Sequence, residues 1–133
     1  MMNYEFSAHC HSNITARHKT TLEFTKDSEL SEKGDCIIGI KADFELEELK
    51  RFMNFDRIRI KITATELTGL TEEITAVPNP DFSSNYELVI RKTDFTSKRT
   101  FAVKADKAAA DMNREFADAL KSNGRIRIHI ENI

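Results

Sequence analysis

A short pattern that occurs twice constrains the fold of this 133-residue chain more than any other feature. The first copy is IKADFELEELKRFMNFDRIRIKI at 40–62, and the second is VKADKAAADMNREFADALKSNGRIRIHI at 103–130. Each copy has an apolar residue, Lys-Ala-Asp, a segment with helical spacing and a strand in which isoleucine alternates with polar residues. Several features that recur in one order are typical of an internal repeat, and we interpret the chain as two copies of one unit.

The repeat predicts how the chain divides. We expect strand, strand, strand, helix, strand in each of the halves 1–67 and 68–133. The strands follow from period-two alternation or short apolar runs and are expected at 4–11, 20–24, 36–40, 57–64, 70–77, 86–90, 100–103 and 125–130. A half of about 65 residues buries too little apolar surface to be stable alone. We therefore expect a single domain, 1–133, of a β-dominated α+β class, with a sandwich or open-barrel core from two pseudo-symmetric β-β-β-α-β halves and two helices.

Individual residues give local signals. Asp43 and Asp106 follow Lys-Ala and are predicted to be helix N-caps, because a carboxylate can accept the free N–H groups of a first turn. The second helix is expected to end at Asn123-Gly124. Gly39 inside an apolar run indicates a bulge or a close neighbour. Thr68-Gly69 predicts a hairpin turn.

Composition excludes several classes of protein. The chain is 40% hydrophobic and 32% charged, which is typical of a folded protein rather than a disordered one. No apolar run approaches the roughly 20 residues that cross a bilayer, and the N-terminus lacks a secretory signal. Two cysteines in such a chain are expected to be reduced, which favours the cytoplasm. The net charge of -2 argues against a strongly basic nucleic-acid coat protein.

Four stretches resemble one archaeal family of unknown function, domain-of-unknown-function family three hundred and seventy-one. They are RHKTTLEFTKD at 17–27, GDCIIGIKAD at 34–43, RKTDF at 91–95 and RTFAVKADKAAADMNRE at 99–115. The resemblance implies a β-rich, sandwich-like fold with accessory helices in a cytoplasmic protein. It implies no reaction and no catalytic or ligand-binding residues.

The two copies of the alternating strand carry outward basic residues. If the halves place these strands side by side, they form a basic patch that could contact nucleic-acid phosphates. Charged side chains also protect exposed strands from aggregation, and aromatic residues that would stack on bases are missing from these positions. Arg91 and Arg99 flank a polar turn with Asp94 and either hold that turn by ion pairs or join the binding surface. The candidate binding residues are Arg57, Arg59, Lys61, Arg125, Arg127, His129, Arg91 and Arg99.

Histidines near the N-terminus suggest two further sites. His9, His11 and Cys36 could bind Zn²⁺ with Asp27 or Asp35, since imidazole and thiolate suit that metal, although no diagnostic spacing is present. His11, His18 and Lys19 are candidate catalytic residues for a phosphate ester. Polar residues on the wet face of a strand are the simpler alternative for all of them.

Taken together, these features favour a non-enzymatic binding module for an anionic ligand, with RNA or a nucleotide preferred. A small hydrolase or phosphoesterase, with or without a metal, is the first alternative, and a protein-interaction subunit is the second. No cofactor is required, and zinc is retained only as an alternative. Whether the protein is an enzyme and whether it forms oligomers are questions that the sequence leaves open.

Overall fold

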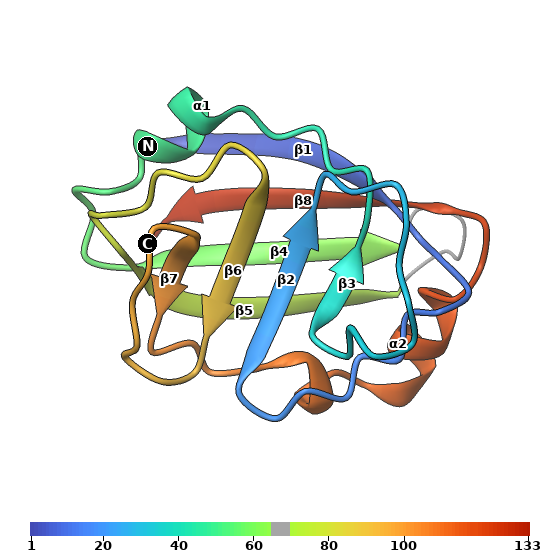
Figure 1. Ribbon diagram of the computed structural model, residues 1–133. Coiled ribbons are helices and arrows are strands. Elements are labelled where there is room, and N and C mark those ends of the chain that lie inside the picture. Colours follow the sequence, from blue (N-terminus) through green and yellow to red (C-terminus); the bar gives the residue numbers. More distant parts are fainter. Residues whose placement is uncertain (65–69) are drawn as a thin grey trace.

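The computed structural model describes residues 1–64 and 70–133 (Figure 1). In these two ranges the strands and helices are β1 (Asn3–His9), β2 (Thr21–Thr25), β3 (Ile37–Gly39), α1 (Leu46–Lys50), β4 (Ile58–Ala64), β5 (Thr71–Pro78), β6 (Glu87–Arg91), β7 (Thr100–Val103), the 3-10 helix η1 (Ala109–Asp111), α2 (Arg114–Ala119) and β8 (Arg125–Asn132). None of the helices in this described part of the chain is long and apolar enough to span a membrane.

The strands form one sheet in the order β1-β8-β4-β5-β7-β6-β2-β3. Figure 1 shows the sheet folded into two layers whose strands cross steeply. We call β1, β8, β4 and β5 the first layer, and β7, β6, β2 and β3 the second layer. The layers are joined where β5 pairs with β7. The edge strands β1 and β3 are linked by an isolated bridge between His9 and Ile40 rather than by a ladder, so the sheet does not close into a barrel. The expected β-dominated α+β fold with a sandwich or open-barrel core is confirmed.

The core lies between the layers and is filled by the alternating residues of the strands. In β4 and β8 the isoleucines at 58, 60, 62, 126, 128 and 130 are buried, as the alternation predicts. Phe6 of β1 meets the edges of Phe24 and Phe44, with ring centroids 5.7 and 5.5 Å apart. Each fully buried side chain of this size contributes about 1.5–3 kcal/mol through removal of apolar surface from water.

Corresponding strands of the two halves make matching pairings. β1 pairs with β8 as β5 pairs with β4, and β2 pairs in parallel with β3 as β6 does with β7. Lys41 and Lys104 both have left-handed backbone, with φ of 50° and 54°. These matched contacts agree with the expected order of elements in the two halves. The internal repeat itself stays a prediction.

Asp43 and Asp106 do not cap helices as predicted. α1 begins three residues beyond Asp43 without a side-chain cap, and α2 is capped by Asn113. Instead, the Oδ1 atom of Asp43 accepts the N–H of Ser7 at 2.7 Å, and that of Asp106 accepts the N–H of Thr75 at 3.0 Å. Both carboxylates therefore satisfy strand N–H groups at the places where β1 and β5 meet the second layer.

The second predicted helix is divided into two short elements. η1 and α2 are separated by Met112 and Asn113, and the extended backbone of Met112 (φ -68°, ψ 146°) interrupts the helical turn. The predicted hairpin turn at Thr68-Gly69 lies outside the described residues. The strands before and after it, β4 and β5, pair antiparallel.

Candidate functional site

The structure brings the basic residues of the two copied strands together on the outer face of the first layer. β4 and β8 are neighbours, and their register places Lys61 opposite His129 and Thr63 opposite Arg127. Arg57 precedes β4, and its guanidinium donates to Thr75 of β5 at 3.0 Å. The expected patch therefore exists as a group of positions, and it is made of Arg57, Arg59, Lys61, Arg125, Arg127 and His129.

Carboxylates are interleaved with these basic residues. Arg59 lies 2.8 Å from Glu131 and 4.0 Å from Glu73, and Arg127 lies 3.1 Å from Glu5. These acidic partners come from three strands. The ion pairs could not be predicted from the sequence, because they depend on the register between strands. The first layer thus presents a surface of mixed charge, on which two of the predicted anion-binding arginines are already paired.

A second group of polar residues lies on the outer face of the second layer. Glu23 in the middle of β2 is only 6% exposed, although its neighbours on the opposite strand face, Leu22 and Phe24, belong to the core. Around it are Cys36 before β3, Glu87 and Arg91 of β6, and Arg99 before β7. We call Glu23, Cys36, Glu87, Arg91 and Arg99 the polar cluster.

Arg99 joins the two carboxyl groups of the polar cluster. Its Nη1 atom lies 3.5 Å from Oε1 of Glu23 and 2.5 Å from Oε2 of Glu87. Burial, together with the nearby Glu87, raises the pKa of Glu23 to about 7, against the opposing effect of Arg99. Glu23 can therefore exchange a proton near neutral pH, which makes it a candidate functional residue.

The thiol of Cys36 is held protonated beside Glu23. Its Sγ atom donates to Oε1 of Glu23 at 3.8 Å, and burial followed by the charge of Glu23 raises the pKa of Cys36 to about 11. Since the thiolate is the nucleophile and the metal ligand, Cys36 in this setting is suited to neither role.

Arg91 is the cation of the polar cluster that has no carboxylate partner. Its Nε atom donates to the hydroxyl of Thr100 at 3.0 Å, and its guanidinium carbon lies 4.9 Å from the centre of the Phe95 ring. Among the described residues, no carboxylate lies within ion-pair distance of it. Burial and then the charge of Arg99 lower the pKa of Arg91. A bound anion would offset both effects.

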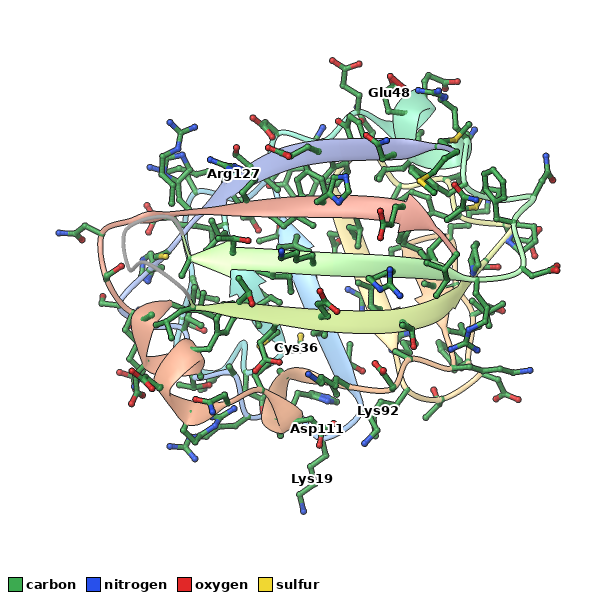
Figure 2. The ribbon with its side chains drawn as sticks, turned by 180° about the vertical axis from the view of Figure 1, so that it is seen from behind. Lys19, Cys36, Glu48, Lys92, Asp111 and Arg127 are labelled. Atoms are coloured by element: carbon green, nitrogen blue, oxygen red, sulfur yellow. The ribbon has the colours of Figure 1, made fainter. Side chains whose placement is uncertain are left out.

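His18 and Lys19 border the polar cluster at the end of β6. The Nδ1 atom of His18 accepts the N–H of Thr20 at 3.2 Å, and the carbonyl of Thr20 accepts the N–H of Lys92, the residue after Arg91, at 2.8 Å. Lys92 forms an ion pair with Asp111 at 3.0 Å. Figure 2 shows Lys19, Lys92 and Asp111 at one edge of the molecule, whereas Arg127 lies away from it beside β8.

The other predicted histidine sites are not assembled. His11 lies in a separate turn, where its Nδ1 atom accepts the N–H of Asn13 at 2.9 Å, and no described contact links it to His18. His9 faces outward from the first layer, while Cys36 belongs to the second. Within residues 1–64 and 70–133, no group of three His, Cys, Asp or Glu side chains is arranged to hold a metal ion.

The polar cluster lies where the two halves differ. The N–H of Glu23 donates to the carbonyl of Cys36 at 2.9 Å, and the N–H of Val89 donates to the carbonyl of Arg99 at 3.0 Å. The backbone positions therefore match, but the side chains differ. Glu23 corresponds to Val89, and Cys36 corresponds to Arg99. Sequence reasoning found Arg91, Arg99 and Cys36 and missed Glu23 and Glu87. A single carboxylate inside the otherwise β-forming run TTLEF was the available signal.

Comparisons with known proteins agree on one family. A family model described as "Domain of unknown function (DUF371)" matches residues 6–133. A protein named as uncharacterized protein MJ0206 from Methanocaldococcus jannaschii is 37% identical over 127 residues, which cover 90% of this chain and 92% of that protein. These matches agree with the resemblance drawn from the four sequence stretches.

Proposed function

The chain belongs to this family of unknown function, and we propose that it is a non-enzymatic binding module for an anionic, phosphate-bearing ligand held at Arg91. The observation that carries the proposal is a partly buried guanidinium with donors to spare and no carboxylate partner among the described residues. A guanidinium forms two parallel hydrogen bonds to a phosphate, so Arg91 is matched to this ligand in geometry and charge.

The outer face of the first layer is a weaker candidate. An anion there would have to compete with Glu131 for Arg59 and with Glu5 for Arg127. Exposed ion pairs are individually weak, but each must be broken before its arginine can bind an anion. At Arg91 the neighbouring charges are Arg99 and Glu23, which form an ion pair with each other, and Lys92, which is paired with Asp111. Arg91 is thus the arginine of the polar cluster that has no ion-pair partner among the described residues.

RNA and nucleotides fit the surroundings of Arg91 better than a simple anion. Phe95 is 60% exposed and lies against the guanidinium. An exposed aromatic ring beside a phosphate-binding arginine can stack on a base, and such stacking contributes about 1–3 kcal/mol per base. The aromatic residue that is missing from the outward positions of the copied strands is therefore present at this second site.

The test compares three arginine variants with the same change of charge. Arg91→Ala removes the proposed ligand contact, and Arg127→Ala tests the first layer. Arg51→Ala, directly after α1, is a control whose ion-pair partner is Glu48. Binding of a ten-nucleotide single-stranded RNA is measured by fluorescence anisotropy at several salt concentrations. We expect Arg91→Ala to weaken binding by about tenfold or more and to reduce the salt slope by about one. Thermal melting checks that each variant is folded.

The results separate the surfaces. Equal affinities for Arg91→Ala and Arg51→Ala would refute the proposed site, and a loss confined to Arg127→Ala would move it to the first layer. Phe95→Ala distinguishes a ligand that has bases from a simple inorganic anion. It should weaken RNA binding and leave the binding of inorganic sulfate, which has no base to stack, unchanged.

A phosphoesterase acting on the same ligand is the second candidate. It is favoured by the position of His18, which reaches the end of β6 through Thr20 and Lys92. Release of phosphate from a nucleoside monophosphate that is lost in His18→Ala, with the fold intact, would support it. His11 does not belong to this candidate site, because it lies in a separate turn.

A further inference from the structure

We propose that the carboxyl pair Glu23–Glu87 takes up a proton when an anion binds at Arg91, so that ligand affinity rises as the pH falls through neutrality. This inference rests on the proposed function, because it concerns the regulation of the same site. It assigns a role to Glu23, which binding at Arg91 alone does not use.

The geometry ties the two carboxyl groups to the ligand site. Both approach one guanidinium nitrogen, Nη1 of Arg99, at 3.5 Å for Glu23 and 2.5 Å for Glu87. The side chain of Glu23 is only 8% exposed, so water screens its charge poorly. Glu23 pairs with Val89, two residues before Arg91 on β6, and Nε of Arg91 donates to the hydroxyl of Thr100, the residue after Arg99. The charge of Arg99 lowers the pKa of Arg91, and the charge of Glu23 raises it. A change of charge at Glu23 is therefore felt at Arg91.

Charge balance decides which group responds. With both carboxyl groups ionised, the two arginines are already neutralised within the polar cluster. An arriving anion then adds negative charge to a partly buried site, which is unfavourable unless a proton comes with it. Protonation of Glu23 is the least costly response, because burial and Glu87 already place its pKa at about 7.

Three segments place charged or titratable groups around Glu23. The segment before β3 supplies Cys36, whose thiol is held protonated, and Asp35 next to it. β6 supplies Glu87 and Arg91, and the segment before β7 supplies Arg99. At the border lies His18, and histidine is the other side chain that commonly changes charge near neutral pH. His18→Ala is therefore included as a control.

The experiment measures proton uptake on binding. Inorganic sulfate and the ten-nucleotide RNA serve as probes, because both keep a constant charge across the range studied. Calorimetric titrations at about pH 6, 7 and 8, in pairs of buffers with different ionisation enthalpies, give the affinity and the number of protons bound. We expect the natural chain to bind about tenfold more tightly at the lowest pH than at the highest and to take up a fraction of a proton near pH 7.

Glu23→Gln is the decisive variant, because the amide keeps the shape of the side chain and cannot ionise. It should bind both probes with nearly the same affinity at each pH and take up no proton, whereas His18→Ala should keep the pH dependence and the proton uptake of the natural chain. Glu87→Gln provides a second variant of the same carboxyl pair. Nuclear magnetic resonance of glutamate carboxyl carbons in the natural chain needs no variant, and sulfate should raise the midpoint at which Glu23 titrates.

The outcomes separate the two proposals. If neither probe binds, or if Arg91→Ala binds both as the natural chain does, the proposed function fails. If binding requires Arg91 but Glu23→Gln keeps the full pH dependence and proton uptake, only the coupling to the carboxyl pair is overturned. A pH dependence that disappears in His18→Ala and persists in Glu23→Gln would assign the proton to the histidine instead.

Discussion

A carboxyl group buried in the middle of a strand must be compensated by its neighbours. Glu23 has one guanidinium and one thiol within reach, and both belong to segments distant in the sequence. Arg99 also serves Glu87, so it cannot fully neutralise Glu23. The protonated form of Glu23 is consequently favoured in the folded state, and the folded protein holds a proton that the unfolded chain would release.

This difference predicts how stability depends on pH. The unfolded glutamate loses its proton near its ordinary pKa of 4.5, while Glu23 in the folded protein keeps its proton to about pH 7. Between these two pKa values the folded state binds more protons than the unfolded state. The contribution of Glu23 to the free energy of unfolding therefore falls as the pH rises through this range, and it is constant above the folded-state pKa. The fall amounts to about 3 kcal/mol.

Glu23→Gln should lack this fall. Urea unfolding at about pH 5 and pH 8 gives the free energies of unfolding of the natural chain and the variant. Between these pH values their difference should shift in favour of the variant by about 2.5 kcal/mol. Glu73→Gln, with an exposed carboxylate on the first layer, is the matched control and should show no such shift. Parallel pH profiles for the natural chain and Glu23→Gln would show that Glu23 titrates normally.

At the scale of the element, β3 is shaped by the close approach of the two layers. A β-carbon on Gly39 would lie 2.8 Å from Cδ1 of Ile126 and 3.0 Å from the β-carbon of Ala8, both in the first layer. The ladder between β2 and β3 also shifts register beside this residue. Of the two alternatives expected at Gly39, a bulge or a close neighbour, the close neighbour is therefore confirmed.

Gly39→Ala should destabilise the protein more than Gly34→Ala. At Gly39 the added methyl meets Ala8, which cannot move aside without its strand, so overpacking should cost about 1–3 kcal/mol. At Gly34 the nearest atoms are the side-chain ends of Leu30 and Ile37, at 3.0 and 3.2 Å, which can rotate away. Chemical denaturation of the two variants measures the difference. Equal losses would contradict tight packing of the layers at β3.

Strands were predictable from sequence because alternation is a local property. The isoleucines of β4 and β8 show their buried face without reference to any other segment. Asp43 and Asp106 were misassigned because their partners, Ser7 and Thr75, are more than 30 residues away. A carboxylate before a helical segment looks the same in sequence whether it caps that helix or a distant strand.

The candidate site was only partly predictable for a related reason. Arg91 and Arg99 were identified from a single polar turn, which is a local feature. Glu23 and Glu87 acquire their roles from the pairing of β2 with β6, which sequence patterns do not reveal. The same applies to the first layer, where cross-strand carboxylates turned an expected basic patch into a surface of mixed charge.

At the scale of the whole molecule, most strand pairings join one half of the chain to the other. β1 and β4 of the first half pair with β8 and β5 of the second, and β2 pairs with β6. Within the first half, the sheet pairing that remains is the short parallel ladder between β2 and β3, with the single bridge at His9. The buried isoleucines of β4 would lose their neighbours on both sides.

We therefore expect fragments 1–67 and 68–133 to be unfolded when each is produced alone and to form the native sheet when mixed. Neither fragment can satisfy its strand N–H groups or bury its apolar face without the other, and a chain of about 65 residues has little reserve of stability. Circular dichroism and the dispersion of amide signals in nuclear magnetic resonance, with the intact chain as reference, measure both effects. A dispersed spectrum from either fragment alone would mean that one half encloses its own core, and residues 1–133 would then be two domains rather than one.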